Sequence, residues 1–291
     1  MKEDYQYDYT DGNFKTQYKI FKGNVNNLLI NSAKYGEIVL VKEALKKQAN
    51  IHAQENYALR LASNYGHIEV VKYLVENGAN FYEGEWALRW AAFHGHLEVT
   101  KYLVESGADI HVCDESATKL AAWNGHLEVV KYLVKRGANF HAMDEFATRW
   151  AAMNGHLEVV KYLVEKGANI HAYNEDATRT AAEYGHLQVV KYLVERGANI
   201  HEENEWALRW AARYGHLQVV KYLVERGANI HEYDEYALRW AAMNGHLEAV
   251  KYLVEKGADF HAKNEEGTIM AAENGYLSVV KYLVEMGAIL P

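Results

Sequence analysis

The chain has 291 residues, of which 49% are hydrophobic and 24% charged, and its formal net charge is −8. This acidic balance, with no long basic run, disfavours nucleic acid and anionic membrane surfaces as partners. The single cysteine, Cys113, cannot form an internal disulfide, and neither a signal peptide nor an apolar run long enough to span a membrane is present. A soluble protein in the cytoplasm is therefore expected.

Residues 1–22 match no other part of the chain. They are predicted to be an N-terminal tail with a possible cap, in which four apolar side chains could cover the first repeat: Phe14, Tyr18, Ile20 and Phe21. A short linear motif built on Tyr5, Tyr7 and Tyr9 is the alternative interpretation of this segment.

From residue 23 to residue 291 one unit recurs, seen clearly as GHLEVVKYLVEKGANIHA at 155–172. Its opening glycine falls at 36, 66, 95, 125, 155, 185, 215, 245 and 275, so the step is 30 residues with one step of 29. A fixed period of this size indicates a solenoid. Nine repeats are predicted, at about 24–53, 54–83, 84–112, 113–142, 143–172, 173–202, 203–232, 233–262 and 263–291.

Each repeat is predicted to contain two short helices and an extended loop, which makes an all-α repeat solenoid. In the repeat at 143–172, Asp144 is expected to cap the first helix, with Glu145 in its first turn. Glu145 and Arg149 are four residues apart, as are Glu235 and Arg239, and these spacings predict ion pairs along the helix. Gly155 is expected to end the first helix.

Three places depart from the pattern. The first repeat carries Asn31, Lys46 and Lys47 at consensus apolar positions, as a polar end repeat should. The short step removes one residue from the loop at 80–86, which either re-aims Trp86 or is a tolerated deletion. The last repeat keeps its apolar positions (Val280, Leu283 and Val284), so either a second copy or a partner covers it or the exposed apolar area is small.

The motifs ALRWAA and GHLEVVKYLVERGAN resemble the ankyrin repeat, whose signature is TPLHLAA followed by GH, a second helix and GA. The resemblance covers residues 24–291. The repeat is shorter than the usual 33 residues, the proline of TPLH is missing, and its histidine is replaced by Arg or Lys. This shorter variant is similar to the ankyrin families of giant amoeba-infecting viruses, which implies a viral protein that binds other proteins.

The histidines are the residues to consider for a metal site. Fourteen of the 15 histidines fall in two columns, one directly after the opening glycine and one in the extended loop. Columns spaced by a repeat do not converge as metal ligands must, so structural roles are expected and no metal or cofactor is predicted. The resemblance leaves one alternative, since His171 follows Leu163 by eight residues, a pattern that an asparaginyl hydroxylase modifies in ankyrin loops. Four tryptophans replace a leucine of the first helix and are predicted to be core residues: Trp90, Trp150, Trp210 and Trp240.

Three other columns vary from repeat to repeat, and they are rich in aromatic residues and methionine. They lie nine, two and twelve residues before each opening glycine. Drift at unconstrained positions is the alternative explanation, but drifting solvent sites rarely accumulate such side chains. The predicted partner-binding residues are Tyr57, Trp86, Phe93, Trp123, Met143, Phe146, Met153, Tyr173, Asp176, Glu183, Glu203, Trp206, Arg213, Tyr233, Tyr236 and Met243.

The apolar members concentrate in the first half and the acids in the second. This predicts a protein or peptide ligand with an apolar anchor toward the N-terminal half and a basic portion toward the C-terminal half. No phosphate loop, nucleophile elbow or zinc-protease motif is present, so no enzyme is predicted. The leading interpretation is a non-enzymatic scaffold that binds a protein on its concave face, and the alternative is a self-associating structural rod.

Overall fold

The computed structural model describes residues 24–80 and 86–289. Over these residues the chain forms eighteen α-helices and no β-strand, which confirms the predicted all-α repeat solenoid of roughly nine repeats. The predicted tail and cap at 1–22 lie outside the described residues, as does most of the loop with the short step, including Tyr82 and Gly84.

The chain divides into two compact units, residues 1–121 with 128–138 and residues 122–127 with 139–291, and each is described by itself. Unit 1 contains α2 (Val25–Tyr35), α3 (Ile38–Lys46), α4 (Ala53–Asn64), α5 (Ile68–Glu76), α6 (Trp86–Phe93), α7 (Leu97–Glu105) and most of α8 (Val112–Trp123) and α9 (Leu127–Lys135). Unit 2 contains α10 (Ala142–Met153), α11 (Leu157–Glu165), α12 (Ala172–Glu183), α13 (Leu187–Glu195), α14 (Glu202–Arg213), α15 (Leu217–Glu225), α16 (Glu232–Met243), α17 (Leu247–Glu255), α18 (Ala262–Glu273) and α19 (Leu277–Met286).

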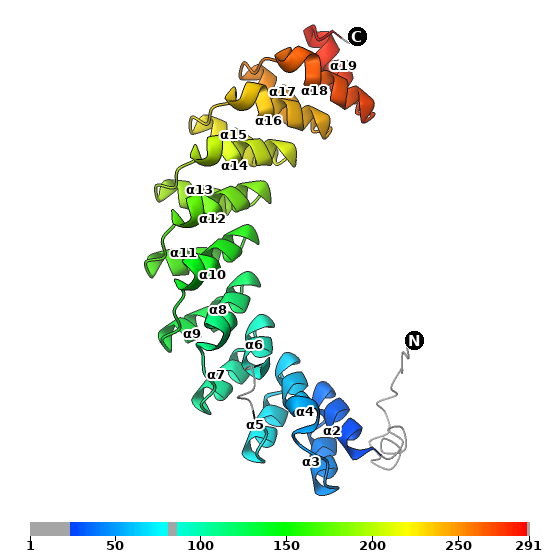
Figure 1. Cartoon of the computed structure of the whole chain (residues 1–291), viewed down its shortest axis with the longest axis vertical. Helices are drawn as coiled ribbons and strands as arrows, with labels where there is room; N and C mark the ends of the chain where they lie inside the picture. Colours follow the sequence, from blue (N-terminus) through cyan, green and yellow to red (C-terminus); the bar gives the residue numbers. More distant parts are fainter. Residues whose placement is uncertain (1–23, 81–85, 290–291) are drawn as a thin grey trace. The chain divides into compact units, whose positions relative to one another are not determined.

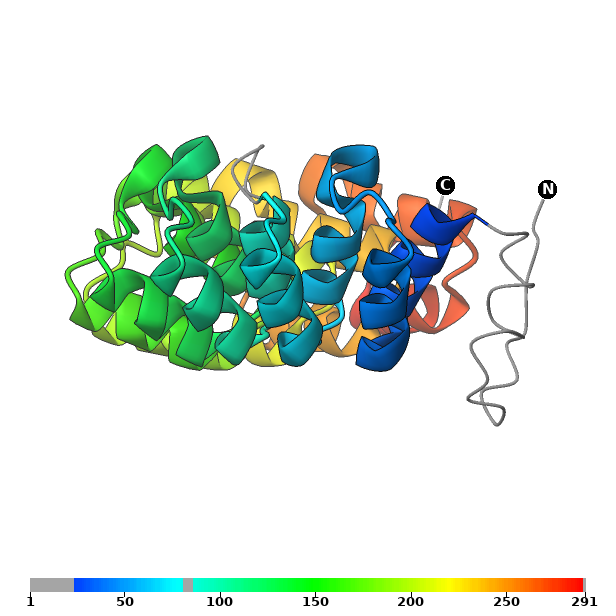
Figure 2. The ribbon, with the colours of Figure 1, turned by 90° about the horizontal axis from the view of Figure 1, so that it is seen from below.

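In each repeat an even-numbered helix comes first and an odd-numbered helix second. Within a unit the first helices pack beside one another in one layer and the second helices in another (Figures 1 and 2). Alanines on the first helix permit this close approach, since Ala147, Ala151 and Ala152 are each at most 1% exposed. The second helix buries Val160 and Leu163 completely. Burial of each large aliphatic side chain stabilises the stack by roughly 1.5–3 kcal/mol.

The turn between the two helices needs glycine for two reasons. Gly155 has φ +76°, a left-handed conformation that disfavours side chains. The adjacent His156 N–H closes the helix end on Ala151 O at 2.8 Å, as predicted for a glycine-terminated helix. In addition, a Cβ at position 155 would lie 2.5 Å from Nδ1 of His186 in the next repeat. The constant glycine therefore makes room for the constant histidine of its neighbour.

That histidine connects successive repeats. His186 Nε2 lies 2.9 Å from Met153 O, at the carboxyl end of the preceding first helix. The same bond recurs between the histidine row and earlier first helices at His67 with Lys34 O, His96 with Asn64 O, His156 with Trp123 O and His246 with Arg213 O. The predicted structural role of this histidine row is thus confirmed.

The start of the first helix differs from the sequence prediction. Met143, Asp144 and Glu145 all have φ between +53° and +62°, so right-handed helix begins at Phe146 and Asp144 is not its cap. Glu145 turns inward instead, is 5% exposed, and receives His141 Nδ1 at 2.5 Å and the Asn169 N–H at 3.1 Å. The loop histidine and this buried acid close the turn together, and the pair recurs at His111–Glu115, His171–Glu175, His201–Glu205, His231–Glu235 and His261–Glu265.

This turn also rules out the predicted ion pairs along the helix. Because Glu145 is not in the helix, it is not on the same helical face as Arg149, which binds Asp176 of the next repeat at 2.7 Å. In the same way Arg239 pairs with Glu266 rather than with Glu235. These two arginines therefore form their ion pairs between repeats rather than along their own helix.

Candidate functional site

The predicted partner-binding residues all lie on first helices or on the left-handed turns before them. Eleven are half-buried on the first helices, namely Tyr57, Phe93, Trp123, Phe146, Met153, Asp176, Glu183, Trp206, Arg213, Tyr236 and Met243. Trp86 is 36% exposed at the start of α6. The turns carry the most exposed members, which are Met143 (54%), Tyr173 (64%), Tyr233 (51%) and Glu203.

The tryptophans predicted to be core residues belong to this surface, so that prediction was wrong. Trp90 and its counterparts Trp150, Trp210 and Trp240 are half-buried, whereas the enclosed position is two residues earlier, as at Leu88 (1% exposed). The helical period explains the difference. Trp86, Trp90 and Phe93 are spaced i, i+4, i+7 and share one helix face. The spacing alone could have placed Trp90 with the other two.

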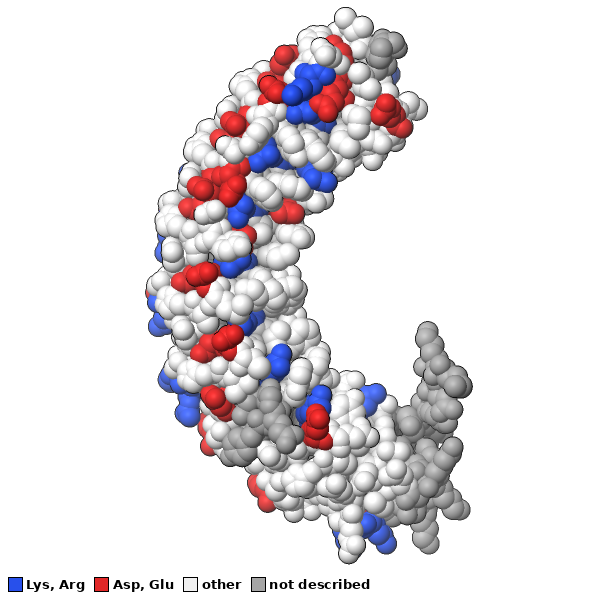
Figure 3. Space-filling model, viewed as in Figure 1, with Lys and Arg blue, Asp and Glu red and all other residues white. Residues whose placement is uncertain are grey.

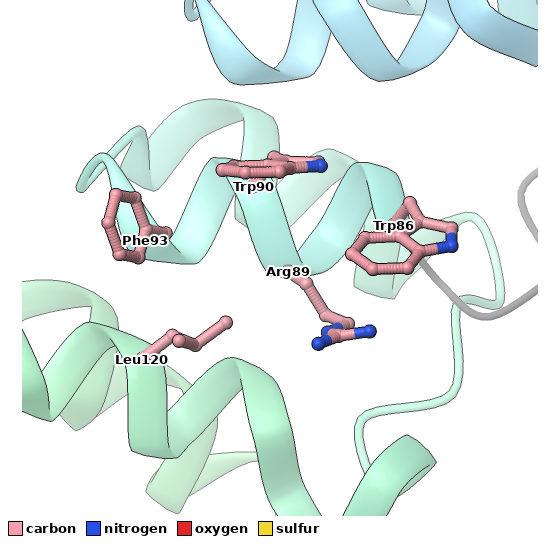
Figure 4. A pocket seen from close by; sticks show the side chains of 5 residues that line it. All are labelled: Trp86, Arg89, Trp90, Phe93 and Leu120. Carbon is pink, nitrogen blue, oxygen red and sulfur yellow. The ribbon is translucent and has the colours of Figure 1, made fainter.

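In unit 1 these side chains surround a pocket of about 180 Å³ between α6 and α8. It is lined by Trp86, Arg89, Trp90, Phe93 and Leu120 (Figure 4). Trp90 contacts both aromatic neighbours, stacking on Trp86 with ring centroids 6.3 Å apart and meeting Phe93 edge-on at 5.8 Å. The walls are therefore mostly aromatic, and Arg89 supplies the charged group.

Unit 2 carries two further pockets between neighbouring first helices. One, of about 340 Å³, is lined by Met153, Asp176, Arg179, Thr180, Glu183, Tyr184 and Trp206. The other, of about 160 Å³, is lined by Arg239, Trp240, Met243, Glu266 and Met270. Both pockets combine apolar walls with paired charged side chains. A ligand could therefore make polar as well as apolar contacts in them.

A row of cations runs through the aromatic columns, at the position six residues before the opening glycines from Gly66 to Gly245. Arg89 lies over the Trp86 ring at 4.2 Å, and Arg149 lies over Tyr173 at 4.4 Å. Arg213, two residues before its glycine, lies between Trp210 and Trp240, at 4.4 and 4.0 Å from their ring centroids. Such contacts contribute about 0.5–1 kcal/mol each at exposed sites. Part of the aromatic content therefore stabilises the stack itself.

Two acidic side chains of unit 2 are less available to a basic ligand than the sequence suggests, because they are paired with arginines or partly buried. Asp176 binds Arg149 at 2.7 Å and lies 3.5 Å from Arg179. Glu183 is half-buried, and desolvation raises its pKa even though the Trp206 indole and Arg213 favour its charged form. Over the helices of unit 2 in view, Figure 3 accordingly shows acidic and basic side chains in small mixed groups rather than a field of one sign. A basic ligand would have to compete with these arginines.

Three histidines have shifted pKa values. The hydrogen bond that His111 donates to Glu115 raises the pKa of this exposed loop histidine. Burial lowers the pKa of His156 and His216 in the other row. Over residues 24–80 and 86–289, no three His, Cys, Asp or Glu side chains gather in an arrangement that could hold a metal ion. In the same part of the chain no helix is long and apolar enough to cross a membrane.

Comparison with known proteins identifies the repeat. The family description "Ankyrin repeats (3 copies)" matches seven overlapping stretches, at residues 15–83, 29–114, 78–144, 118–204, 149–234, 180–264 and 208–290. Together these stretches cover nearly the whole chain. No curated protein matches it with significance.

Proposed function

The chain belongs to the ankyrin repeat family, whose members are generally protein–protein interaction modules, and we propose that it is a non-enzymatic scaffold for a protein or peptide partner. The binding surface would be the i, i+4, i+7 face of the first helices together with the turns before them. The observation that carries the proposal is the set of half-exposed aromatic side chains around the pocket at Trp86, Trp90 and Phe93. Aromatic residues and methionine are enriched in the centres of protein interfaces.

The nine repeat boundaries predicted from the sequence form part of this proposal. They place one first helix in each repeat, with a left-handed turn before it in seven of the repeats described, so each unit presents several copies of the same face. In the ankyrin family this face corresponds to the concave surface, which is where a partner is expected to bind. Variation between copies would then set which partner side chain each position accepts.

We also propose that the protein is viral and acts on host or viral proteins in the host cytoplasm. The support is the similarity of its 30-residue repeat, with NIHA and ALRWAA, to the ankyrin families of giant amoeba-infecting viruses. Capture from an amoebal lysate followed by mass spectrometry tests this proposal. A partner retained by the native chain should be lost when Trp86, Trp123 and Phe146 are all changed to Ala.

The matched control is Tyr65→Ala, which removes an aromatic side chain that is 47% exposed but is not among the residues of the proposed site. Its far-UV circular dichroism and that of the triple variant should match the native spectrum. If the triple variant retains the same partners as the native chain, the proposed surface is wrong.

A self-associating rod is the second candidate. The last repeat leaves four apolar side chains exposed, namely Leu277 (75%), Val284 (44%), Met286 (48%) and Ile289 (70%). Exposed apolar patches can mark interaction surfaces. Light scattering should then show a mass that rises with concentration and falls back for Leu277→Asp. A strict monomer at high concentration would contradict this candidate.

A further inference from the structure

The row of cations follows a rule that one repeat breaks. Five arginines of this row, each six residues before its glycine, are met by the residue nine before the glycine of the next repeat. That residue offers either a carboxylate or an aromatic ring: Asp176 to Arg149, Glu266 to Arg239, Trp86 to Arg60, Trp206 to Arg179 and Tyr236 to Arg209. For these five arginines, the next repeat thus supplies the partner.

Arg89 receives neither. The corresponding residue of the next repeat is Ser116, which is 6% exposed and too short to reach a guanidinium as a carboxylate does. Its Oγ is buried without a hydrogen-bond partner, and so is Nε of Arg89. Within the described residues Arg89 has no ion pair, and only the Trp86 ring lies against its guanidinium. A buried donor left unpaired is unfavourable, so an incoming acceptor would be favoured here.

The same arginine lines the pocket of unit 1. Its remaining walls are apolar, from Trp86, Trp90 and Phe93 on α6 and Leu120 on α8 (Figure 4). At about 180 Å³ the cavity is smaller than the roughly 300–1,000 Å³ clefts that hold whole small molecules, and it suits a single side chain. A second cation, Lys119, lies close enough for Arg89 to help lower its pKa, although burial lowers it more. The cavity is therefore apolar inside and cationic at its edge.

We propose that this pocket binds a peptide segment of the partner in which a large apolar side chain stands next to an Asp or Glu. The apolar side chain enters between Trp90, Phe93 and Leu120. The neighbouring carboxylate accepts from the guanidinium of Arg89, in the place that Asp176 and Glu266 occupy for Arg149 and Arg239. This inference rests on the proposed scaffold function and specifies its partner at one position.

The 160 Å³ pocket of unit 2 is an internal control. It has Trp240 where unit 1 has Trp90, Met243 for Phe93, Met270 for Leu120 and Arg239 for Arg89. Its arginine is already paired with Glu266. That pocket should accept an apolar side chain without preferring an acidic neighbour.

The probe is a random linear peptide library displayed on phage and selected on the full chain. Selected peptides should carry Asp or Glu beside a large apolar residue. One selected peptide and its Asp→Asn form are then titrated by fluorescence anisotropy against the native chain and two variants. Ser116→Asp supplies Arg89 with a carboxylate from within the chain. Because position 116 is buried, Arg89→Gln is the second variant, which removes the charge of Arg89 and leaves Ser116 in place.

The Asn form should bind the native chain about tenfold or more weakly than the Asp form, because hydrogen bonds to charged groups are the strong ones. Ser116→Asp and Arg89→Gln should each remove that difference, because neither variant leaves Arg89 as an unpaired charge that favours the Asp form. Glu266→Ser should create a second site that prefers the Asp form. Circular dichroism of each variant checks the fold.

Two results separate the inference from the function on which it rests. If peptides bind in a Trp90-dependent way but the Asp and Asn forms bind the native chain equally, the acidic specificity is wrong and the scaffold surface stands. If no selected peptide depends on Trp90 or Phe93, the pocket does not bind peptides and the proposed surface is also wrong.

Discussion

The turn glycine offers a sharp test of how the repeats are connected. Replacing Gly155 with Ala forces a side chain into a left-handed conformation, which costs roughly 1–2 kcal/mol. The new Cβ would also lie 2.5 Å from Nδ1 of His186. Carbon and nitrogen atoms cannot approach so closely, so the imidazole must move and lose its 2.9 Å bond to Met153 O. Loss of that bond adds about 0.5–1.5 kcal/mol.

Gly275 is the matched control, because it has φ +78° in the same turn and nothing within 4 Å of its Cβ position. Gly275→Ala should lower the free energy of unfolding by only the cost of the left-handed backbone, about 1–2 kcal/mol. Gly155→Ala should lower it by about 1.5–3.5 kcal/mol, because the hydrogen bond of His186 is lost as well. Urea unfolding followed by circular dichroism measures both. Since long repeat arrays can unfold in parts, hydrogen exchange at the amides of α10–α13 is measured as well.

His186→Ala should remove the clash, so the additional cost of Gly155→Ala should disappear in the double variant. Equal destabilisation by Gly155→Ala and Gly275→Ala in the native background would refute the account of the glycine–histidine pair.

Two further predictions concern charges within the stack. Because the Glu115 hydrogen bond raises the folded-state pKa of His111, this pair stabilises the fold fully below the ordinary value of 6.5 and loses its contribution as the pH rises through the raised pKa. Glu115→Gln should abolish that loss in urea titrations across the neutral range, and an unchanged pH profile would contradict the assignment. Asp176→Ala leaves Arg149 without its carboxylate where both side chains are mostly buried (14% and 18% exposed), and thermal unfolding should show a loss of about 1–3 kcal/mol. Glu158→Ala, which breaks an exposed pair with lysine, should cost less than about 1 kcal/mol, and equal costs would contradict the difference in burial.

The sequence was sufficient for the architecture because the repeat period and the glycine columns reflect local backbone requirements. Gly155 could be assigned to a helix end from its position alone, and the helices before and after it follow the predicted apolar spacing. The role of the histidine that follows each of these glycines could not be predicted in the same way. His186 contacts Gly155 and Met153 of the preceding repeat, and a distance between repeats cannot be obtained from spacing along the chain.

Errors arose where the backbone departs from a regular helix. The pairing of Glu145 with Arg149 assumed helical geometry at both residues, and three left-handed residues instead direct the glutamate to His141. Trp90 was assigned to the core from its correspondence to a family leucine, although its i, i+4, i+7 relation to Trp86 and Phe93 was visible in the sequence. That Arg89 lacks an ion pair within the described residues could be recognised only after the structure showed which residue of the next repeat meets the other arginines.

The most direct test of the scaffold proposal is hydrogen–deuterium exchange of the full chain, with and without a protein captured from the host lysate. With the captured protein bound, exchange should be slower in the first helices that carry the aromatic faces, such as α6 and α10, and in the turns before them. Exchange in the second helices, such as α7 and α11, should not change. Protection confined to the second helices, or to α19 alone, would contradict the proposed binding surface.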